Sequence, residues 1–300
     1  MLRLVSRVEG RVGITHWHRR ACTIAWSKRM PDTQMKQPFL TVPLPSNRSV
    51  SKPRRTGLTM MMDWGLPLGM QRDWLSLIAP HVDLAKLVVG TARLYEEQYL
   101  LDKLALYEEH DITPFLGGQF LEYVFETQGM PGVQPFCDEA RRLGIGAIEV
   151  SDNVVPLTDH QRKELIHIAI DCGLEVHGEV GSKSDDSGAA ALVSQAEMCF
   201  EAGADVVLVE GAELLRNSQP NDSLIEGLRA GLELDRVIFE LSGTWIPGTY
   251  NTDVYALKSF LVKRFGPDVN LANVMPEHIF ETEALRCGLS VGGPPNSASK

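Results

Sequence analysis

Four glutamates recur at nearly constant intervals between residues 149 and 240, each at the end of an apolar run. Glu149 ends AIE, Glu179 ends HGE, Glu210 follows VVLV and Glu240 follows VIF, at separations of 30, 31 and 30 residues. One β/α/β unit needs about 30 residues. The interval therefore predicts four successive β/α units, with a carboxylate at the carboxyl-terminal tip of each strand.

Strand-like and helix-like segments alternate from residue 57 to residue 290. The predicted strands are Leu58–Met62, Ala85–Val89, Ile112–Leu116, Ala147–Val150, Leu174–Val180, Val206–Val209, Val237–Phe239 and Asn270–Val274. Each is followed by apolar residues at helical spacing. Eight such units favour a single (β/α)8 TIM-type barrel of the α/β class, with an open doubly wound sheet as the main alternative.

The ends of the chain differ from the predicted barrel (57–290) in composition. Residues 1–35 carry seven arginines and lysines against Glu9 and Asp32. That composition fits a transit peptide, but it also fits translated upstream sequence before a start at Met30 or Met35, which we favour. Residues 36–56 are expected to form an extended arm over the barrel's lower end, and residues 291–300 a flexible tail.

Overall charge narrows the classes of partner. The formal net charge is −10, from 29 lysines and arginines against 39 acidic residues, which argues against nucleic acid or an anionic membrane. A small anionic substrate is still compatible with local cations. No apolar run reaches the roughly 18 residues of a membrane span. Scattered cysteines predict a reduced, cytoplasmic protein, and homo-oligomerisation stays open.

Side-chain alternation along a strand places each glutamate above an inward apolar residue, such as Leu208 below Glu210. A single buried glutamate could be explained by a salt bridge. Four at matching positions indicate a shared function, and oxygen ligands in this number suit Mg²⁺. Zinc is disfavoured, because His177 lies below Glu179 with no second histidine, and we interpret His177 as an interior residue.

Two lysines and several turns are expected at the same rim. Lys86 lies in the apolar run LAKLVVG, so it should point inward toward carboxylates or an anion. Lys183, in the loop GSKSDDSG, could hold an anionic substrate or transfer a proton. Backbone N–H groups of the turns at Gly90, Gly117 and Gly243 could bind phosphate.

Together these residues resemble the phosphosulfolactate synthase family of coenzyme M biosynthesis. The matching segments are KPRRTGLTMMMDWGLP, DLAKLVVGT, FLGGQFLEY, RRLGIGAIEVSDN, LEVHGEVGSK, EAGADVVLVEG, RVIFE and FGPDVNLANVMPEHIFETEALRCGL, which span roughly residues 50 to 290. The resemblance implies a β/α barrel that adds sulfite to phosphoenolpyruvate with Mg²⁺, through an enolate intermediate. It also implies that the family's acid lysine corresponds to Lys183.

The resulting assignment divides the site into three groups of residues. Catalytic roles go to Lys183 and Glu179, and metal-ligand roles to Glu149, Glu210, Glu240 and Asp63. Substrate-binding roles go to Lys86, Thr91, Gly117, Gly118, Gln119, Asp152 and Asn273.

Four turns depart from the family pattern. Val88-Val89-Gly90-Thr91 replaces Gly-x-Gly-Thr, Gly117-Gly118-Gln119 replaces Gly-Gly-Thr, Glu210-Gly211-Ala212-Glu213 replaces Glu-x-Arg-Glu, and Glu240-Leu241-Ser242 replaces Glu-Ala-Pro. The third change removes an arginine expected to bind an anion, for which Arg216 is a candidate replacement. A different substrate is therefore expected.

Two other functions stay open on the sequence alone. A divalent-metal sugar isomerase or epimerase would also use carboxylates on successive strand tips, although the sequence lacks its usual histidine ligands. A non-catalytic protein resembling the plant heat-stress-associated members of the family would account for the lost arginine.

Overall fold

The structure is a computed structural model that describes residues 38–181, 188–216, 219–291 and 293. The chain divides into two compact units, at residues 1–43 and 44–300. In the first, the described residues 38–43 form a turn in which the Val42 N–H donates to the Phe39 carbonyl. The second contains the barrel.

Eight parallel strands of the second unit close into a barrel, as predicted. They are β1 (Thr59–Asp63), β2 (Leu84–Leu87), β3 (Thr113–Leu116), β4 (Ala147–Val150), β5 (Glu175–Val180), β6 (Val206–Val209), β9 (Val237–Glu240) and β10 (Leu271–Val274). They follow one another around the barrel in chain order, and β10 pairs with β1. The predicted strand positions are confirmed to within one residue at nearly every end.

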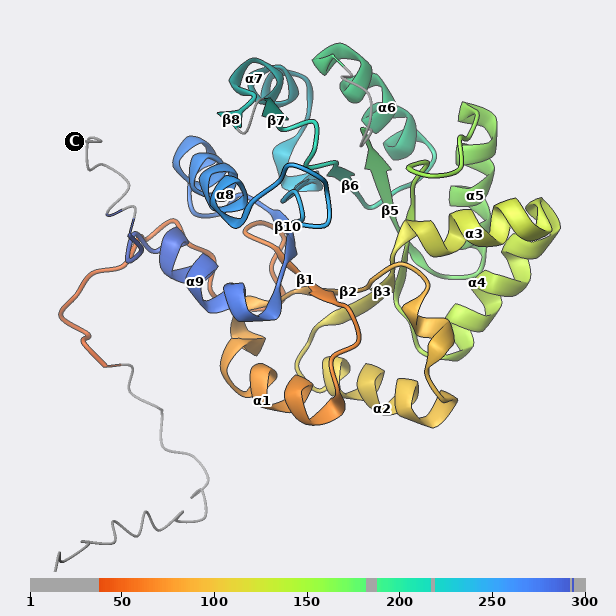
Figure 1. Cartoon of the computed structure of the whole chain (residues 1–300), viewed down its shortest axis with the longest axis horizontal. Coiled ribbons are helices and arrows are strands. Elements are labelled where there is room, and N and C mark those ends of the chain that lie inside the picture. Colours follow the sequence, from red (N-terminus) through yellow and green to blue (C-terminus); the bar gives the residue numbers. More distant parts are fainter. Residues whose placement is uncertain (1–37, 182–187, 217–218, 292, 294–300) are drawn as a thin grey trace, which may run out of the picture. The chain divides into compact units, whose positions relative to one another are not determined.

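Helices surround the strands (Figure 1). They are α1 (Leu68–Ile78), α2 (Glu97–Glu108), α3 (Gly118–Gln128), α4 (Val133–Arg142), α5 (Asp159–Asp171), α6 (Ala189–Glu201), α7 (Asp222–Gly231), α8 (Asn251–Phe265) and α9 (Pro276–Arg286). Short 3₁₀ turns are η1 (Ala79–His81), η2 (Thr91–Leu94), η3 (Met130–Gly132) and η4 (Leu234–Arg236). Strands β7 (Leu215–Arg216) and β8 (Gln219–Pro220) form a small antiparallel pair. No helix of the described residues has the length and apolarity needed to cross a bilayer.

Local signals explain where several helices begin and end. Thr158 accepts a hydrogen bond from the Gln161 N–H while the Gln161 side chain accepts from Thr158, which is the predicted capping box of α5. Gly173 and Gly203, with φ of 79° and 104°, end α5 and α6 in a conformation that other residues rarely adopt.

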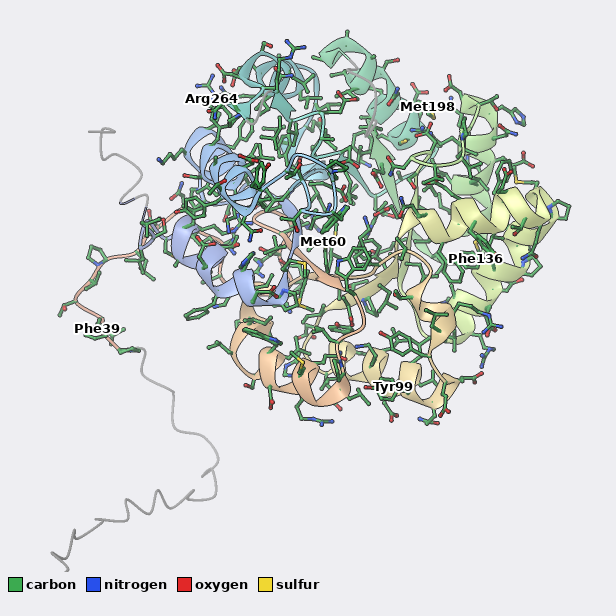
Figure 2. The ribbon with its side chains drawn as sticks, in the orientation of Figure 1. Phe39, Met60, Tyr99, Phe136, Met198 and Arg264 are labelled. Atoms are coloured by element: carbon green, nitrogen blue, oxygen red, sulfur yellow. The ribbon has the colours of Figure 1, made fainter. Side chains whose placement is uncertain are left out.

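The barrel interior is filled by an apolar cluster of buried residues. Its members are Leu58, Met60, Phe115, Ala147, Leu208, Ile238 and Ala272. Figure 2 shows Met60 among the strands and Met198 and Arg264 on surrounding helices. Since alternate side chains share a face, Glu149, Glu210 and Glu240 each lie one pleat above a member of this cluster. The interior is therefore apolar below and acidic at the carboxyl-terminal rim.

Residues 44–56 bind the opposite, lower end of the barrel through buried ion pairs. Arg48 bonds Glu283 of α9 and Asp268, and Arg54 bonds Asp83, just before β2. Lys52 donates to the carbonyls of Ala79 and His110. These contacts bring distant parts of the chain together away from the acidic rim.

Candidate active site

Three glutamates converge inside the upper rim of the barrel. Glu149, Glu179 and Glu240, from β4, β5 and β9, each offer a carboxylate oxygen, and these atoms lie within 4.8 Å of one another. All three residues are buried. Glu210, the first residue after β6, is also buried and lines the same cavity, whose volume is about 300 Å³. We call this space the glutamate cavity.

Lys86 is the cation of this cluster. Its Nζ lies 2.6 Å from Glu149 Oε2 and 3.2 Å from Glu240 Oε1. Burial disfavours the charged ammonium, but the neighbouring carboxylates outweigh it and raise the pKa of Lys86 well above its ordinary value. Lys86 is therefore protonated at neutral pH, with its ammonium directed at the glutamates as predicted.

The carboxylates exceed the cations that the described cavity residues provide. Burial raises the pKa of Glu149 well above its ordinary value; Lys86 opposes this rise, whereas the charges of Glu179 and Glu240 add to it. Among the described residues, one ammonium faces three clustered carboxylates, so these four groups together carry a net negative charge when all are ionised. A further cation would offset that excess.

Two glycines allow the chain to approach these side chains closely. Gly118, the first residue of α3, donates its N–H to Glu149 Oε1 at 2.8 Å. A Cβ at Gly118 would lie 2.1 Å from Ser151 Oγ and 3.0 Å from that Glu149 oxygen. A Cβ at Gly117 would lie 3.2 Å from Lys86 Cε. Both predicted glycines and Gln119 line the cavity.

Glu179 is held in place by two residues. The Asn153 side chain donates to Glu179 Oε1 at 2.6 Å, and Arg162 of α5 donates to the Glu179 carbonyl at 3.2 Å. The loop that carries Asn153 is itself anchored by buried Glu122 of α3, which accepts from the backbone N–H groups of Asn153, Val154 and Val155.

Asn153 and Glu122 were missed by the sequence reasoning. Asn153 stands directly beside Asp152, which was assigned to substrate. In the structure Asp152 forms an ion pair with Arg162 and does not line the glutamate cavity, whereas Asn153 does. The expected position of Asp152 at the cavity is therefore corrected, and its neighbour Asn153 lies there instead. Polar residues after a strand tip were the signal, and the path of the loop after β4 decides which of the two reaches the cavity.

Asp63 is also corrected, because it does not join the glutamates. It is fully buried, and its Oδ2 pairs with Lys103 Nζ at 2.8 Å and accepts from the Tyr107 hydroxyl at 2.7 Å. Met60 and Met62 occupy the inward face of β1, so the alternation turns Asp63 outward toward α2. Its carboxylate ties β1 to α2 instead of ligating a metal.

Other predicted residues have mixed positions. Thr91 does not line the cavity; its hydroxyl donates to the Val88 carbonyl within the turn after β2. Asn273 lines the cavity, and its φ of 59° is unusual for a residue other than glycine. Arg216 is exposed and is not among the cavity residues. Lys183 lies outside the described residues.

His177 is interior, as interpreted from the sequence. Its ring meets Phe115 edge-on, with centroids 4.7 Å apart. Burial, with a smaller contribution from the charge of Lys86, lowers its pKa to about 4. The imidazole is therefore neutral at physiological pH and packs in the interior of the barrel.

Aromatic and apolar side chains border the remaining part of the glutamate cavity. Trp64, after β1, and Trp245, after β9, contact each other edge-on with ring centroids 5.5 Å apart. Ile246 and Pro247 extend this border, and Val88 lines the cavity as well. Apolar groups therefore lie beside the glutamates at the rim.

The family model that matches residues 47–291 is described as (2R)-phospho-3-sulfolactate synthase (ComA). Phosphosulfolactate synthase from Methanothermobacter thermautotrophicus is 31% identical over 262 residues, 84% of this chain and 94% of that protein. The Bacillus subtilis phosphosulfolactate synthase is 28% identical, over 80% of this chain and 92% of that protein.

A plant protein and a solved structure are more distant. Arabidopsis thaliana protein HEAT-STRESS-ASSOCIATED 32 is 22% identical, over 78% of this chain and 87% of that protein. A structure of Rhizobium etli pyruvate carboxylase, 13% identical with a TM-score of 0.53, matches 76% of this chain but only 24% of its own length, and shows a shared fold. The match to the family model and to full-length relatives shows that this chain belongs to the phosphosulfolactate synthase family of enzymes.

Proposed function

We propose that this protein is a Mg²⁺-dependent carbon–sulfur lyase of the phosphosulfolactate synthase type. It would add sulfite, or a similar nucleophile, to phosphoenolpyruvate through an enolate intermediate. The observation that carries the proposal is the convergence of Glu149, Glu179 and Glu240 around Lys86 in a buried cavity. Family membership supports the same reaction class.

The donor set fits a hard divalent cation. Octahedral Mg²⁺ binds oxygen at about 2.1 Å, so its ligand atoms stand about 3 to 4 Å apart. Oxygens from the three glutamates lie within 4.8 Å of one another, so small movements of these side chains would bring the oxygens to the separations that Mg²⁺ requires. When bound, Mg²⁺ would act as a Lewis acid toward the oxygens of the substrate that gain negative charge.

The chain's own groups would then position and stabilise the substrate. Protonated Lys86 supplies a positive charge inside the cavity, where low exposure strengthens its attraction for an enolate oxygen. Helix α3 begins at Gly118, so its N-terminus lies at the same cavity. Asn153 holds Glu179 in a fixed orientation, so that carboxylate would not need to reorganise during the reaction.

Proton delivery to the carbon beside the attacked methylene group needs an acid. The resemblance assigns that role to Lys183, and we retain it as part of the proposal. Its loop follows Gly181, which lies directly after β5 and near Glu210. Lys86 is a poor alternative acid, because its raised pKa makes proton release unfavourable.

One observation favours a second candidate, a non-catalytic role like that suggested by the name of the heat-stress-associated relative. Among the described residues that line the glutamate cavity, Lys86 is the only lysine or arginine. Phosphoenolpyruvate carries a phosphate and a carboxylate, so a site that has lost anion contacts could have lost turnover too. No structural observation favours the hypothesis of a divalent-metal sugar isomerase or epimerase in the same way.

Mass spectrometry distinguishes the two. The protein is incubated with phosphoenolpyruvate, sulfite and Mg²⁺, and parallel reactions contain chelator or the Lys183→Ala variant. The proposal predicts a sulfonated phospho-acid in the first reaction only, with the melting temperature of the variant nearly unchanged. A folded protein that forms no adduct with sulfite or with other nucleophiles would favour the non-catalytic role.

A further inference from the structure

A second and larger cavity adjoins the glutamate cavity. It has a volume of about 990 Å³ and lies among the loop after β9, helix α8 and helix α9. Trp64, Gly243, Trp245 and Asn273 line both cavities, so they form the boundary between them. We call this larger space the annex.

The size of the annex exceeds what the expected small substrates require. Pockets that enclose whole organic ligands measure about 300 to 1,000 Å³. Sulfite has one sulfur and three oxygens, and phosphoenolpyruvate is also small, so the glutamate cavity of about 300 Å³ is the better match in size for these compounds. The annex, at about 990 Å³, can hold an organic molecule larger than either of them.

The walls of the annex are largely apolar, and their described glutamates outnumber their lysines and arginines. Val254, Met275, Phe280 and Ala284 contribute apolar surface. Lys258 is the only lysine or arginine among its described lining residues, and it forms an ion pair with Glu281 and a hydrogen bond with Thr282. Glu277 adds a second carboxylate. This composition disfavours a ligand with several negative charges.

Three buried polar atoms of the annex lining indicate which hydrogen-bonding groups a ligand should carry. Ser242 Oγ, Asn273 Oδ1 and Glu281 Oε1 have no hydrogen-bond partner among the described residues. Ser242 is only 2% exposed. All three atoms are shielded by protein in this structure, so a ligand would reach them only after a small side-chain movement. The Asn273 and Glu281 oxygens can only accept, and donors on a ligand would then satisfy them.

We propose that the annex binds the organic body of the second substrate, a neutral or cationic compound with an apolar part and hydrogen-bond donors. This inference rests on the proposed addition reaction and specifies an organic compound bearing an X–H group as the nucleophile that can take the place of sulfite in it. X would bond to the methylene carbon of phosphoenolpyruvate as the carbon–carbon π bond breaks, and the neighbouring carbon would gain a proton. Atoms and electrons balance without an oxidant or reductant.

The boundary residues place the two ligands within reach of each other. Trp245 packs against its own loop, since a Cβ at Gly243 would lie 2.1 Å from the indole ring. Gly243 therefore lets the ring fold onto the backbone at the junction of the cavities. Trp64, which follows β1, contacts that ring edge-on, and only β10 lies between the two strands that carry the pair. The two tryptophans therefore lie between the acidic glutamate cavity and the more apolar annex.

Isothermal titration calorimetry with two matched probes tests the annex on the full chain. Tyramine is a cation with donors and an aromatic body, and 3-(4-hydroxyphenyl)propionate has the same body with a carboxylate. Tyramine is expected to bind at least about tenfold more tightly, the size expected for one charge-assisted hydrogen bond. Equal affinities, or no tyramine binding at millimolar concentration, would overturn the proposal.

Variants locate the bound probe. Ala284→Phe fills the annex and should weaken tyramine binding about tenfold or more, whereas Ala190→Phe, on the exposed face of α6, should leave it unchanged. Ser242→Ala, a milder change, should weaken it about fivefold, which covers the case in which Ala284→Phe does not fold. Wild-type affinity in both folded variants would contradict the assignment.

The same titration separates this inference from the proposed function. It needs neither metal nor phosphoenolpyruvate, so tyramine can bind the annex even if the adduct assay fails. With Mg²⁺ and phosphoenolpyruvate added, tyramine affinity should persist, because the two cavities bind different ligands. Competition by phosphoenolpyruvate would place tyramine in the glutamate cavity and overturn the proposal.

Discussion

At the scale of single residues, the chemistry of the rim depends on how closely the backbone approaches the glutamates. Gly118 contributes an N–H to Glu149, and its missing side chain leaves room for Ser151. The sequence identified Gly118 as a turn residue near the site. It did not identify the contact with Ser151, because that contact joins two β/α units and depends on their relative position.

Gly118→Ala should therefore damage the site directly. The new Cβ would lie 2.1 Å from Ser151 Oγ, so Ser151 and Glu149 must shift. We expect a stability loss of about 1 to 3 kcal/mol, typical of overpacking, and a clear fall in adduct formation. Denaturant unfolding and the mass-spectrometric assay measure the two effects.

Gly69→Ala is the matched control, since a Cβ there meets no atom within 4 Å and the residue lies in α1. That substitution should be neutral or slightly stabilising. If both variants had the same stability and activity, the close approach at Gly118 would have no functional importance.

At the scale of elements, the β/α repeat could be predicted well and the direction of some side chains could not. The 30-residue interval placed Glu149, Glu179, Glu210 and Glu240 at four strand ends that line one cavity. Asp63 failed because its strand presents Met60 and Met62 inward. Asp152 failed because the chain leaves the strand before it, and loop residues have no fixed alternation. The period of two directs Asp63 outward within β1, whereas no such period applies to Asp152 in the loop after β4.

The lower end of the barrel gives a prediction about acid stability. Arg48 lies away from the acidic rim. Its ion pairs with Glu283 and Asp268 join residues 44–56 to the lower end of the barrel. Burial opposes ionisation of both carboxyl groups, yet hydrogen bonds hold their pKa values below the ordinary ones. The main hydrogen-bond donor to Glu283 is Arg48, and the donors to Asp268 are Ser49 and Arg48. Their stabilisation is therefore present above the unfolded-state pKa values and is lost as pH falls through the lower folded-state values.

Arg48→Met should cost about 3 to 5 kcal/mol at pH 7, because it leaves buried carboxylates without their partner. The difference from wild type should shrink as pH falls below about 4, when the carboxyls become protonated. Urea unfolding at several pH values measures this trend. Arg142→Met, which removes ion pairs on the exposed surface with Glu97 and Glu139, is the control and should change little. A pH-independent effect of Arg48→Met would rule out the electrostatic explanation.

At the scale of the whole molecule, the eight-stranded barrel followed from the number and spacing of the apolar runs. The annex could not be predicted, since it depends on how α8, α9 and the loop after β9 pack together. The resemblance noted from the sequence did suggest a changed turn at Leu241 and Ser242, where this loop begins. What it could not show is that the altered loop brings Trp245 against Trp64, more than 150 residues earlier in the chain.

The most direct test of the account is the effect of Mg²⁺ on the melting temperature of the full chain, compared between wild type, Glu240→Gln and the exposed-surface variant Glu108→Gln. A ligand at about 100 times its Kd should stabilise the native state by about 2.7 kcal/mol. The account predicts an increase in wild type and Glu108→Gln and a much smaller one in Glu240→Gln. An equal response in all three proteins, or none in any, would contradict a metal site formed by the clustered glutamates.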